Sequence, residues 1–271
     1  MAAECILGVI GVGQMGGALV RGMVRAGVLA PEQIVVADAD PERLAALAKE
    51  LGVKTAASNS QAAERSESVL LAVKPGLAAG IANEIAAAVG GEQTLVSVAT
   101  GVLIERLRDA LGRPDAAVIR VMPNTPALVG AGAFAVAAPG VALERVEALK
   151  RLLEPLGRVV VVGEELMDAV TGLSGSGPAF VFVMIEAMAD GGVAAGLPRS
   201  TAQLLAAQTV LGAAKMVLET EEHPAALKDA VASPGGTTIA GLSKLERGGF
   251  RAAIVSAVRA AAKRARELSE G

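Results

Sequence analysis

The stretch Ile6-Leu7-Gly8-Val9-Ile10-Gly11-Val12-Gly13-Gln14-Met15-Gly16 decides the fold. Its apolar first half predicts a buried strand, and the residues that follow, up to position 26, have the spacing of an amphipathic helix. The glycines fit the pattern GxGxxG, in which they permit a tight turn, the approach of a pyrophosphate to the backbone, and close packing of the helix. The pattern predicts a dinucleotide site at the helix N-terminus. A tight turn without a ligand is the alternative.

The same alternation of strand and helix patterns continues along the chain. Short β-branched runs at 34–37, 69–73, 94–98, 118–122, 133–137 and 159–162 alternate with helical patterns at 41–51, 77–89, 102–111 and 143–153. This rhythm is typical of a parallel sheet with helices on both faces. After Glu164 only helical patterns and Gly/Pro turn signals remain. We therefore predict an α/β protein with a Rossmann-like domain over residues 1–163 and an all-helical domain over 164–271.

Composition excludes several classes of partner. The 25 Lys and Arg residues against 28 Asp and Glu residues give a net charge of -3, which provides no long-range attraction to nucleic acid or anionic lipid. The single Cys5 excludes an internal disulfide framework and fits a reducing cytoplasm. Prolines and glycines interrupt the long uncharged runs, so we expect no membrane-spanning helix. No cluster of residues has metal-ligand spacing. A cytoplasmic protein with a small soluble substrate is predicted.

Two helical patterns in the C-terminal half, at 179–195 and 201–218, are apolar nearly all the way round. A small helical domain cannot cover two such helices from one chain, so a partner subunit is expected to bury them. The sequence therefore predicts an obligate homo-oligomer that assembles through this half.

The second predicted strand ends at Asp38, which is close to the spacing at which a Rossmann fold reads the adenosine ribose. A carboxylate there accepts hydrogen bonds from a 2′-hydroxyl and repels a 2′-phosphate, which favours NADH over NADPH. Alternatively, Asp38 or Asp40 simply caps the helix that begins at Pro41. Arg43 lies within reach of a 2′-phosphate, so the preference is a hypothesis.

Polar loops follow two other predicted strands. Lys74, before Pro75 and Gly76, should lie at the carboxyl edge of the sheet, where it could support the cofactor or a substrate carboxylate. A solvated lysine before a turn is the alternative. Asn124 and Thr125 lie between two prolines and offer hydrogen-bonding groups, although a purely structural corner explains them equally well.

In the helical half, residues 174–179 and 233–238 each place hydroxyls and small residues before a helix N-terminus, which suits a carboxylate, although plain capping explains one such segment. The only histidine, His223, precedes a proline at a predicted helix start, so we expect a cap or surface role and not a proton donor. The chain contains no tyrosine, and hence no Tyr-x-x-x-Lys pair, so the usual strong acid for the reduction of a carbonyl group is hard to find. Reduction of a cyclic imine avoids much of this need, because the imine nitrogen is basic enough to arrive protonated. The protein then chiefly positions the hydride donor and acceptor.

Longer motifs resemble a known family, the pyrroline-5-carboxylate reductases. They cover residues 168–179 (Asp-Ala-Val-Thr-Gly-Leu-Ser-Gly-Ser-Gly-Pro-Ala), 190–192, 227–229 and 233–238, together with residues 72–75 and 124–126. The resemblance runs nearly the whole chain. It implies NAD(P)H-dependent reduction of the C=N bond of 1-pyrroline-5-carboxylate to L-proline, the last step of proline biosynthesis. It also implies a C-terminal all-helical dimerisation domain, an active site where the two domains meet with both subunits of a dimer contributing, and in many members a decamer.

Residue roles follow from the matching positions. With the fingerprint, the predicted cofactor-binding residues are Ile10, Gly11, Val12, Gly13, Gln14, Met15, Gly16, Asp38, Asn59, Ala72, Val73, Lys74, Pro75, Val98, Ala99 and Thr100. The predicted substrate-binding residues are Asn124, Ser174, Ser233, Gly235, Gly236, Thr237 and Thr238. The resemblance places the Thr238 hydroxyl near the ring nitrogen, and the predicted catalytic residues are Thr238, Ser233 and Lys74. Relatives that prefer NADPH often have a small hydroxyl residue where this chain has Asp38, which agrees with the charge argument.

Two other functions stay open from the sequence. One is a different two-domain dehydrogenase that acts on a β-hydroxyacid or a related imine. It predicts a catalytic lysine in the first interdomain helix, and residues 168–178 contain none. The other is a non-catalytic dinucleotide sensor, which would bind the dinucleotide without turning over the imine.

Overall fold

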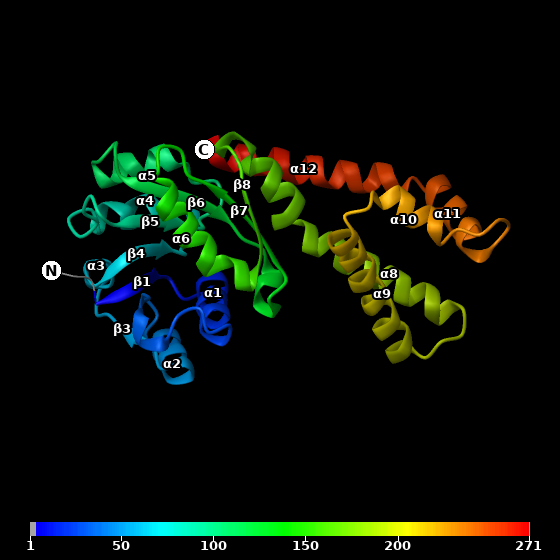
Figure 1. Ribbon diagram of the computed structural model, residues 1–271, viewed down its shortest axis with the longest axis horizontal. Coiled ribbons are helices and arrows are strands. Elements are labelled where there is room, and N and C mark those ends of the chain that lie inside the picture. The colour runs from blue at the N-terminus through cyan, green and yellow to red at the C-terminus, as the bar shows by residue number, and fades with distance from the viewer. Residues whose placement is uncertain (1–3, 271) are drawn as a thin grey trace. The chain divides into compact units, whose positions relative to one another are not determined.

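The computed structural model describes residues 4–270 and divides them into two compact units (Figure 1). The first unit runs to Ser176 and takes in the end of the chain from Ala260 onward. The second unit covers Gly177–Arg259.

An eight-stranded sheet forms the centre of the first unit, in the order β3-β2-β1-β4-β5-β6-β7-β8. Neighbouring strands are parallel except β6 and β7, which are antiparallel. The strand order reverses beside β1, with β2 on one side and β4 on the other, and such a switch point is where open α/β sheets bind ligands. The strands are β1 (Cys5–Ile10), β2 (Ile34–Ala37), β3 (Lys54–Thr55), β4 (Ser66–Leu71), β5 (Thr94–Ser97), β6 (Ala117–Met122), β7 (Gly132–Ala137) and β8 (Gly157–Val161).

Helices cover both faces of this sheet, as the apolar character of its strands requires. Leu107 and Ile85 belong to the core on one face, whereas Leu19, Leu47 and Leu149 belong to the core on the other. The helices are α1 (Gln14–Arg25), α2 (Pro41–Leu51), α3 (Asn59–Glu64), α4 (Pro75–Glu84), α5 (Ile104–Leu111), α6 (Leu143–Leu153) and α7 (Met167–Val170), with short 3-10 turns at Pro31–Gln33, Thr125–Val129, Glu154–Leu156 and Glu164–Leu166. The predicted α/β class and Rossmann-like arrangement are confirmed.

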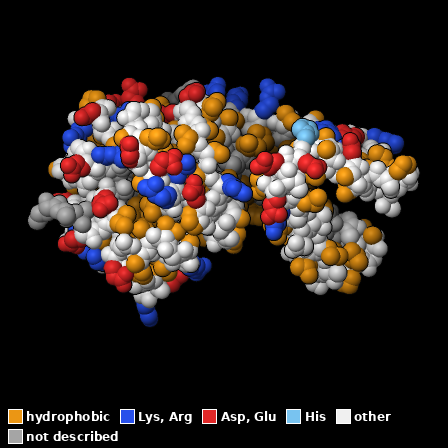
Figure 2. Space-filling view, in the orientation of Figure 1, with side chains coloured by type: hydrophobic (Ala, Val, Ile, Leu, Met, Phe, Trp, Pro, Cys, Tyr) orange, Lys and Arg blue, Asp and Glu red, His pale blue; other side chains and the backbone are white. Residues whose placement is uncertain are grey.

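Helices alone make up the second unit, which is the predicted class for this half. They are α8 (Gly177–Ala194), α9 (Arg199–Thr220), α10 (Pro224–Ala230), α11 (Thr237–Arg247) and the first part of α12 (Phe250–Glu270). A small cluster of Ala189, Ala202 and Ala206 is buried where α8 packs on α9. Large apolar side chains elsewhere on these two helices are exposed, among them Phe182 at 63% and Leu204 at 69%. Figure 2 shows hydrophobic side chains gathered over the lobe that α8 and α9 form.

The first compact unit continues to Ser176, whereas the domain boundary was predicted at Gly163, where the strand pattern ends. The difference has a physical cause. Met167 is fully buried in the core of the first unit, and Glu164 and Asp168 pair with Arg120 on β6. Residues 164–176 therefore pack with the sheet although they are helical.

We expected no helix that is long and apolar enough to cross a membrane, and this expectation is wrong. Judged by length and composition alone, the segments Glu164–Ala194 and Arg199–Thr220 could span one, with mean hydropathies of 1.3 and 1.2. We expected the glycines and Pro178 to break the first segment. Pro178 is instead the second residue of α8, where a helix does not need its N–H group. Composition alone does not distinguish a membrane span from an apolar helix that another protein chain covers.

Candidate active site

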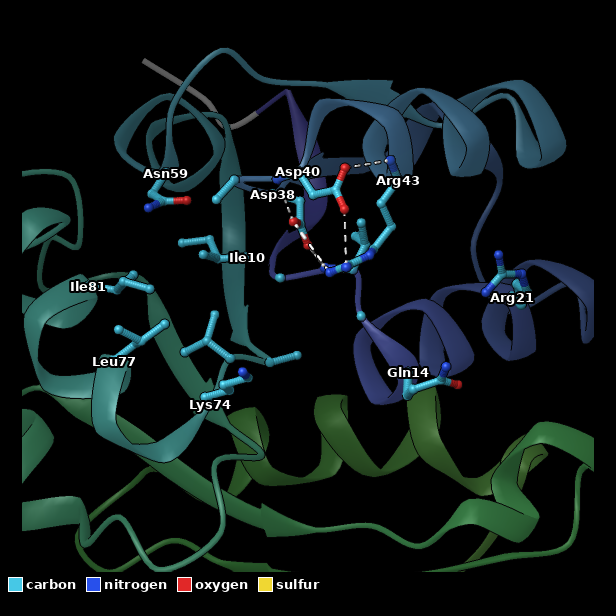
Figure 3. A pocket seen from close by; sticks show the side chains of 16 residues that line it. Ile10, Gln14, Arg21, Asp38, Asp40, Arg43, Asn59, Lys74, Leu77 and Ile81 are labelled. Carbon is cyan, nitrogen blue, oxygen red and sulfur yellow. Dashed lines mark hydrogen bonds and ion pairs between the residues drawn. The ribbon is translucent and has the colours of Figure 1, made fainter.

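A cavity of about 910 Å³ lies at the carboxyl ends of β1, β2 and β4, at the switch point of the sheet (Figure 3). This volume is in the range of cofactor and ligand pockets. The predicted cofactor residues that line it are Ile10, Gly11, Val12, Gly13, Gln14, Asp38, Asn59, Ala72, Val73 and Lys74. Residues that line it without having been assigned to the site are Arg21, Ala39, Asp40, Arg43, Leu77 and Ile81.

The glycine loop has the geometry that a dinucleotide needs. Gly11 has a φ of +92°, and a Cβ there would lie 2.5 Å from the Ala72 carbonyl oxygen. A Cβ on Gly16 would collide with the Gly11 carbonyl oxygen. At Gly13 the nearest atom to a Cβ would be Arg43 Nη1, 3.8 Å away, so the backbone is open toward the cavity. Gly13 is also the N-cap of α1 and has no side chain to cap the first N–H groups, which leaves them for an anion such as a pyrophosphate.

The carboxylate of Asp38 is held rigidly beside this loop. Its Oδ2 accepts a hydrogen bond from the Val12 N–H at 2.7 Å, and its Oδ1 accepts one from the Asp40 N–H at 2.9 Å. The side chain is 9% exposed. Asp40 has the other predicted role, because its carboxylate accepts from the N–H groups of Glu42 and Arg43 and caps α2. Asp40 is therefore the helix cap, whereas a contact between Asp38 and a ribose stays a prediction.

Arg43 lies between these two acidic residues. Its Nη2 is 3.1 Å from Asp40 Oδ2, and its Nη1 is 3.7 Å from Asp38 Oδ1 (Figure 3). The arginine side chain is half exposed. Its positive charge is therefore already shared between two carboxylates at the rim of the cavity.

The opposite wall of the cavity comes from the start of α4. Lys74 is the N-cap residue of this helix, and Leu77 and Ile81 follow on the side that faces Ile10 in Figure 3. These two apolar residues were not predicted for the site, although they lie on the helix that Lys74 begins. Asn59 lines the same cavity and donates its Nδ2 to Glu84 Oε2 at 2.9 Å.

Other predicted cofactor residues of the first unit lie outside the cavity lining. Met15 and Gly16 are within α1, Pro75 begins α4, and Val98, Ala99 and Thr100 follow β5. The Val98 N–H donates to the Leu71 carbonyl at 3.1 Å, which places the loop after β5 beside the end of β4. Among the residues that the structure describes, no group of three or more His, Cys, Asp and Glu side chains could hold a metal ion.

Both the nitrogen and the oxygen of the Asn124 side-chain amide form hydrogen bonds within the protein. Its Nδ2 donates to the Ser174 carbonyl at 3.1 Å, and its Oδ1 accepts from the Ala133 N–H at 2.8 Å. Ser174 belongs to a π-helical turn, Thr171–Gly175, and its hydroxyl donates to the Val170 carbonyl. Such turns are frequent at functional sites. The structure thus assigns Asn124 the role of a corner, and its contact with a substrate stays a prediction.

The predicted substrate loop lies in the second unit, at the N-terminus of α11. Gly236 is the N-cap residue, and its N–H donates to the Ser233 carbonyl at 3.1 Å. Gly235 has a φ of +67°. Thr237 and Thr238 are the first two residues of the helix, and Thr238 is half-buried. The first N–H groups and hydroxyls are thus together at one helix end, which suits a carboxylate.

His223 is the N-cap residue of α10, and its Nδ1 accepts a hydrogen bond from the Ala225 N–H at 3.2 Å. The expectation of a capping role for the only histidine is confirmed.

Known proteins of one family are similar to this chain over nearly its whole length. Residues 164–268 match a family model described as "Pyrroline-5-carboxylate reductase dimerisation", and residues 6–101 match one described as "NADP oxidoreductase coenzyme F420-dependent". A pyrroline-5-carboxylate reductase from Synechocystis sp. is 49% identical over 97% of this chain and 98% of its own length.

Solved structures agree with these matches. A pyrroline-5-carboxylate reductase from Coxiella burnetii superposes with a TM-score of 0.91 at 35% identity, covering 98% of this chain and 99% of its own. A pyrroline carboxylate reductase from Plasmodium falciparum, solved with NADP bound, superposes with a TM-score of 0.87 at 31% identity. The match covers 99% of this chain and 100% of the Plasmodium chain. The chain belongs to the pyrroline-5-carboxylate reductase family.

Proposed function

We propose that this protein is an oxidoreductase that reduces the C=N bond of 1-pyrroline-5-carboxylate to L-proline with NAD(P)H, the last step of proline biosynthesis. The observation that carries the proposal is the open glycine loop and uncapped helix N-terminus at the switch-point cavity, in a chain of this family. The reduced dinucleotide supplies a hydride, which adds to the ring carbon of the C=N bond. The protonated ring nitrogen takes the electron pair of the broken π bond and becomes the amine of proline.

The chain's own residues bind and orient the two reactants. The backbone from Gly11 to Gln14 and the start of α1 would hold the pyrophosphate, and Asp38 would accept hydrogen bonds from a ribose hydroxyl. In the second unit, the N–H groups and hydroxyls from Ser233 to Thr238 would hold the substrate carboxylate, with the Thr238 hydroxyl near the ring nitrogen. Lys74 would add a positive charge at the cavity.

NADH is proposed as the preferred donor. A 2′-phosphate would meet the Asp38 carboxylate, which two backbone N–H groups hold in place, so the carboxylate cannot turn away without losing both hydrogen bonds. The arginine that could compensate, Arg43, is already shared between two carboxylates. The catalytic efficiency with each donor tests this choice, and a tenfold advantage of NADPH would refute it.

Self-association through the helical unit follows from its apolar surface and from the family description of residues 164–268. A homodimer is the proposed minimal assembly, and a decamer of such dimers is the proposed larger one. Burial in this dimer would also account for the apolar α8 and α9 without a membrane. The proposed location is the cytoplasm, with no nucleic acid or metal as a partner.

A single assay separates the enzyme from a sensor. Purified protein is mixed with NADH or NADPH and pyrroline-5-carboxylate, and both the loss of reduced nicotinamide and the formation of proline are followed. We expect one proline for each dinucleotide oxidised. Tight dinucleotide binding without proline formation would favour the sensor instead.

A further inference from the structure

A buried charge network lies in the first unit, outside the cavity. At its centre is Arg120 on β6, whose side chain is only 4% exposed. Its Nη1 is 3.3 Å from Glu164 Oε1, and its Nη2 is 4.0 Å from Asp168 Oδ1. A buried cation is unfavourable unless carboxylates pair with it, and both carboxylates come from the segment that follows β8. This segment is therefore fixed on the sheet by charge.

Glu164 connects this network to the start of α5. Its Oε1 accepts a hydrogen bond from the N–H of Ile104 at 2.8 Å. Ile104 is the first residue of α5 and is itself buried. The loop of residues 98–103, between β5 and α5, is thus fixed at its far end by Glu164.

Asp168 connects the network to the last turns of α12. The Ser269 hydroxyl donates to the Ala265 carbonyl at 2.9 Å and also lies 3.3 Å from Asp168 Oδ1, and Nε of the largely exposed Arg266 lies 4.0 Å from Asp168 Oδ2. Ala265 on the same turns is 4% exposed. The final turns of the helix are therefore docked on the first unit.

The docked turns also lie against the loop of residues 98–103. A Cβ on Gly101 would be 3.3 Å from Ser269 Oγ and 3.5 Å from the Leu268 carbonyl oxygen. Gly101 has a φ of +78°, so the loop turns sharply at the point where the helix covers it. The loop is thus held by α12 in its middle and by Glu164 at its end.

The sheet topology indicates which part of a dinucleotide this loop would meet. Asp38, which is proposed to bind the ribose, follows β2 on one side of β1, and the glycine loop follows β1 itself. A dinucleotide whose pyrophosphate lies on the glycine loop must direct its other half to the opposite side, toward β4 and β5. The loop of residues 98–103 follows β5, and its first residue, Val98, is bonded to the end of β4.

We propose that Asp168 and the docked turns of α12, with Ser269 and Arg266, are positioning residues that hold the loop of residues 98–103 against the nicotinamide half of the dinucleotide. This inference rests on the proposed function. None of these residues needs to touch the reacting atoms. Hydride transfer depends steeply on the placement of donor and acceptor, and a misplacement of about 1 Å can cost about a hundredfold in rate. The glycine loop holds the pyrophosphate independently, so the effect should fall on kcat more than on dinucleotide affinity.

Three variants and one matched control test the network. Asp168→Asn keeps the shape of the side chain and removes its charge, Ser269→Ala removes the hydroxyl, and Arg266→Gln removes the second cation. The control is Arg264→Gln on the same helix, because Arg264 donates to Glu267 at 2.9 Å in an exposed pair, where it lowers the pKa of the Glu267 carboxyl.

Three measurements are made on each full-length variant. Amide hydrogen exchange of residues 98–103 without dinucleotide reports on the loop itself. The dissociation constant is measured from the change in NADH fluorescence on binding. Steady-state kcat is measured with the cyclic imine.

We expect all three variants to raise the amide exchange of the loop. Asp168→Asn should lower kcat by about tenfold, and Ser269→Ala and Arg266→Gln should each lower kcat by about threefold. The dissociation constant should change by less than about threefold, and Arg264→Gln should match the parent.

Loop exchange and kcat equal to those of the control would overturn the inference, as would a lower kcat with unchanged loop exchange. If Asp168→Asn does not fold, the two milder variants decide the question. A parent that forms no proline refutes the proposed function, whereas the exchange measurement still tests the positioning.

Discussion

The two units of this protein bury their apolar residues in different ways. In the first unit, both faces of the sheet are covered by helices of the same chain, and residues such as Leu71 and Ile119 are fully buried. In the second unit, α8 and α9 bury three alanines between them and leave Phe182 and Leu204 exposed. The first unit is therefore expected to hold its cofactor site by itself, and the second to depend on a second copy of the chain.

The variant with the largest expected effect disrupts the dinucleotide site of the first unit and leaves the second unit intact. Gly16→Val should weaken dinucleotide binding by at least about a hundredfold, because any Cβ collides with the Gly11 carbonyl oxygen and moves the glycine loop. Calorimetric titration with NADH measures the affinity, and sedimentation measures the assembly, which should be unchanged. Gly80→Ala is the control, since a Cβ there meets nothing within 4 Å. Loss of assembly in Gly16→Val would contradict the independence of the two units.

The second prediction addresses the exposed surface of the helical unit. Leu204→Asp should weaken self-association on the order of a hundredfold, because a carboxylate would be buried in an apolar contact in each copy. Analytical ultracentrifugation over a range of concentrations measures this change. Leu143→Asp in the first unit is the matched control, with a parent side chain 68% exposed against 69% for Leu204. Equal behaviour of the two variants would remove α9 from the interface.

The third prediction tests the substrate loop of the second unit. Thr238→Ala should lower kcat/KM by about ten to a hundredfold, as expected for the loss of one catalytic hydrogen bond, with NADH affinity unchanged. Ser243→Ala is the control on the same helix, because its hydroxyl donates to the Ile239 carbonyl within α11. An unchanged rate in Thr238→Ala would remove this hydroxyl from the mechanism and leave the family assignment intact.

The smallest expected effect concerns the choice of dinucleotide in the first unit. Asp38→Ser should shift the ratio of kcat/KM for NADPH to that for NADH upward by about tenfold, because the repelling carboxylate is gone and Arg43 then pairs with Asp40 alone, which leaves its Nη1 for a 2′-phosphate. Assays with both donors under identical conditions measure the ratio. Asp38→Ser combined with Arg43→Gln should lose most of the gain. A ratio that stays constant would show that the carboxylate does not select the donor.

The sequence predicted most of the fold, because strongly periodic segments are the easiest to read. Helices expected at 179–195 and 201–218 span Gly177–Ala194 and Arg199–Thr220. The two-residue strand β3 was missed, since it is too short to show an alternation. The π-helical turn at Thr171–Gly175 was missed as well, because a pattern search for 3.6-residue periods does not detect a wider turn.

The site was predictable where a motif fixed its position. The glycine loop and Asp38 could be named because their spacing follows from the βαβ unit itself. The partners of Arg43 are close to it in sequence, but which carboxylates its guanidinium meets depends on the side-chain conformation. The network around Arg120 could not be named, since its partners meet only after the sheet has formed. Asp168 and Ser269, for example, are 101 positions apart in sequence. Contacts of this kind need coordinates.

The open start of α1 also has a practical consequence for enzymology. The backbone N–H groups that Gly13 leaves uncapped are expected to attract sulfate or inorganic phosphate as well as a coenzyme. Buffers that contain these anions are therefore expected to compete with the coenzyme and to raise its measured Michaelis constant. Kinetic constants for this protein should therefore be determined in a zwitterionic buffer, and crystals intended for soaking should be grown without sulfate.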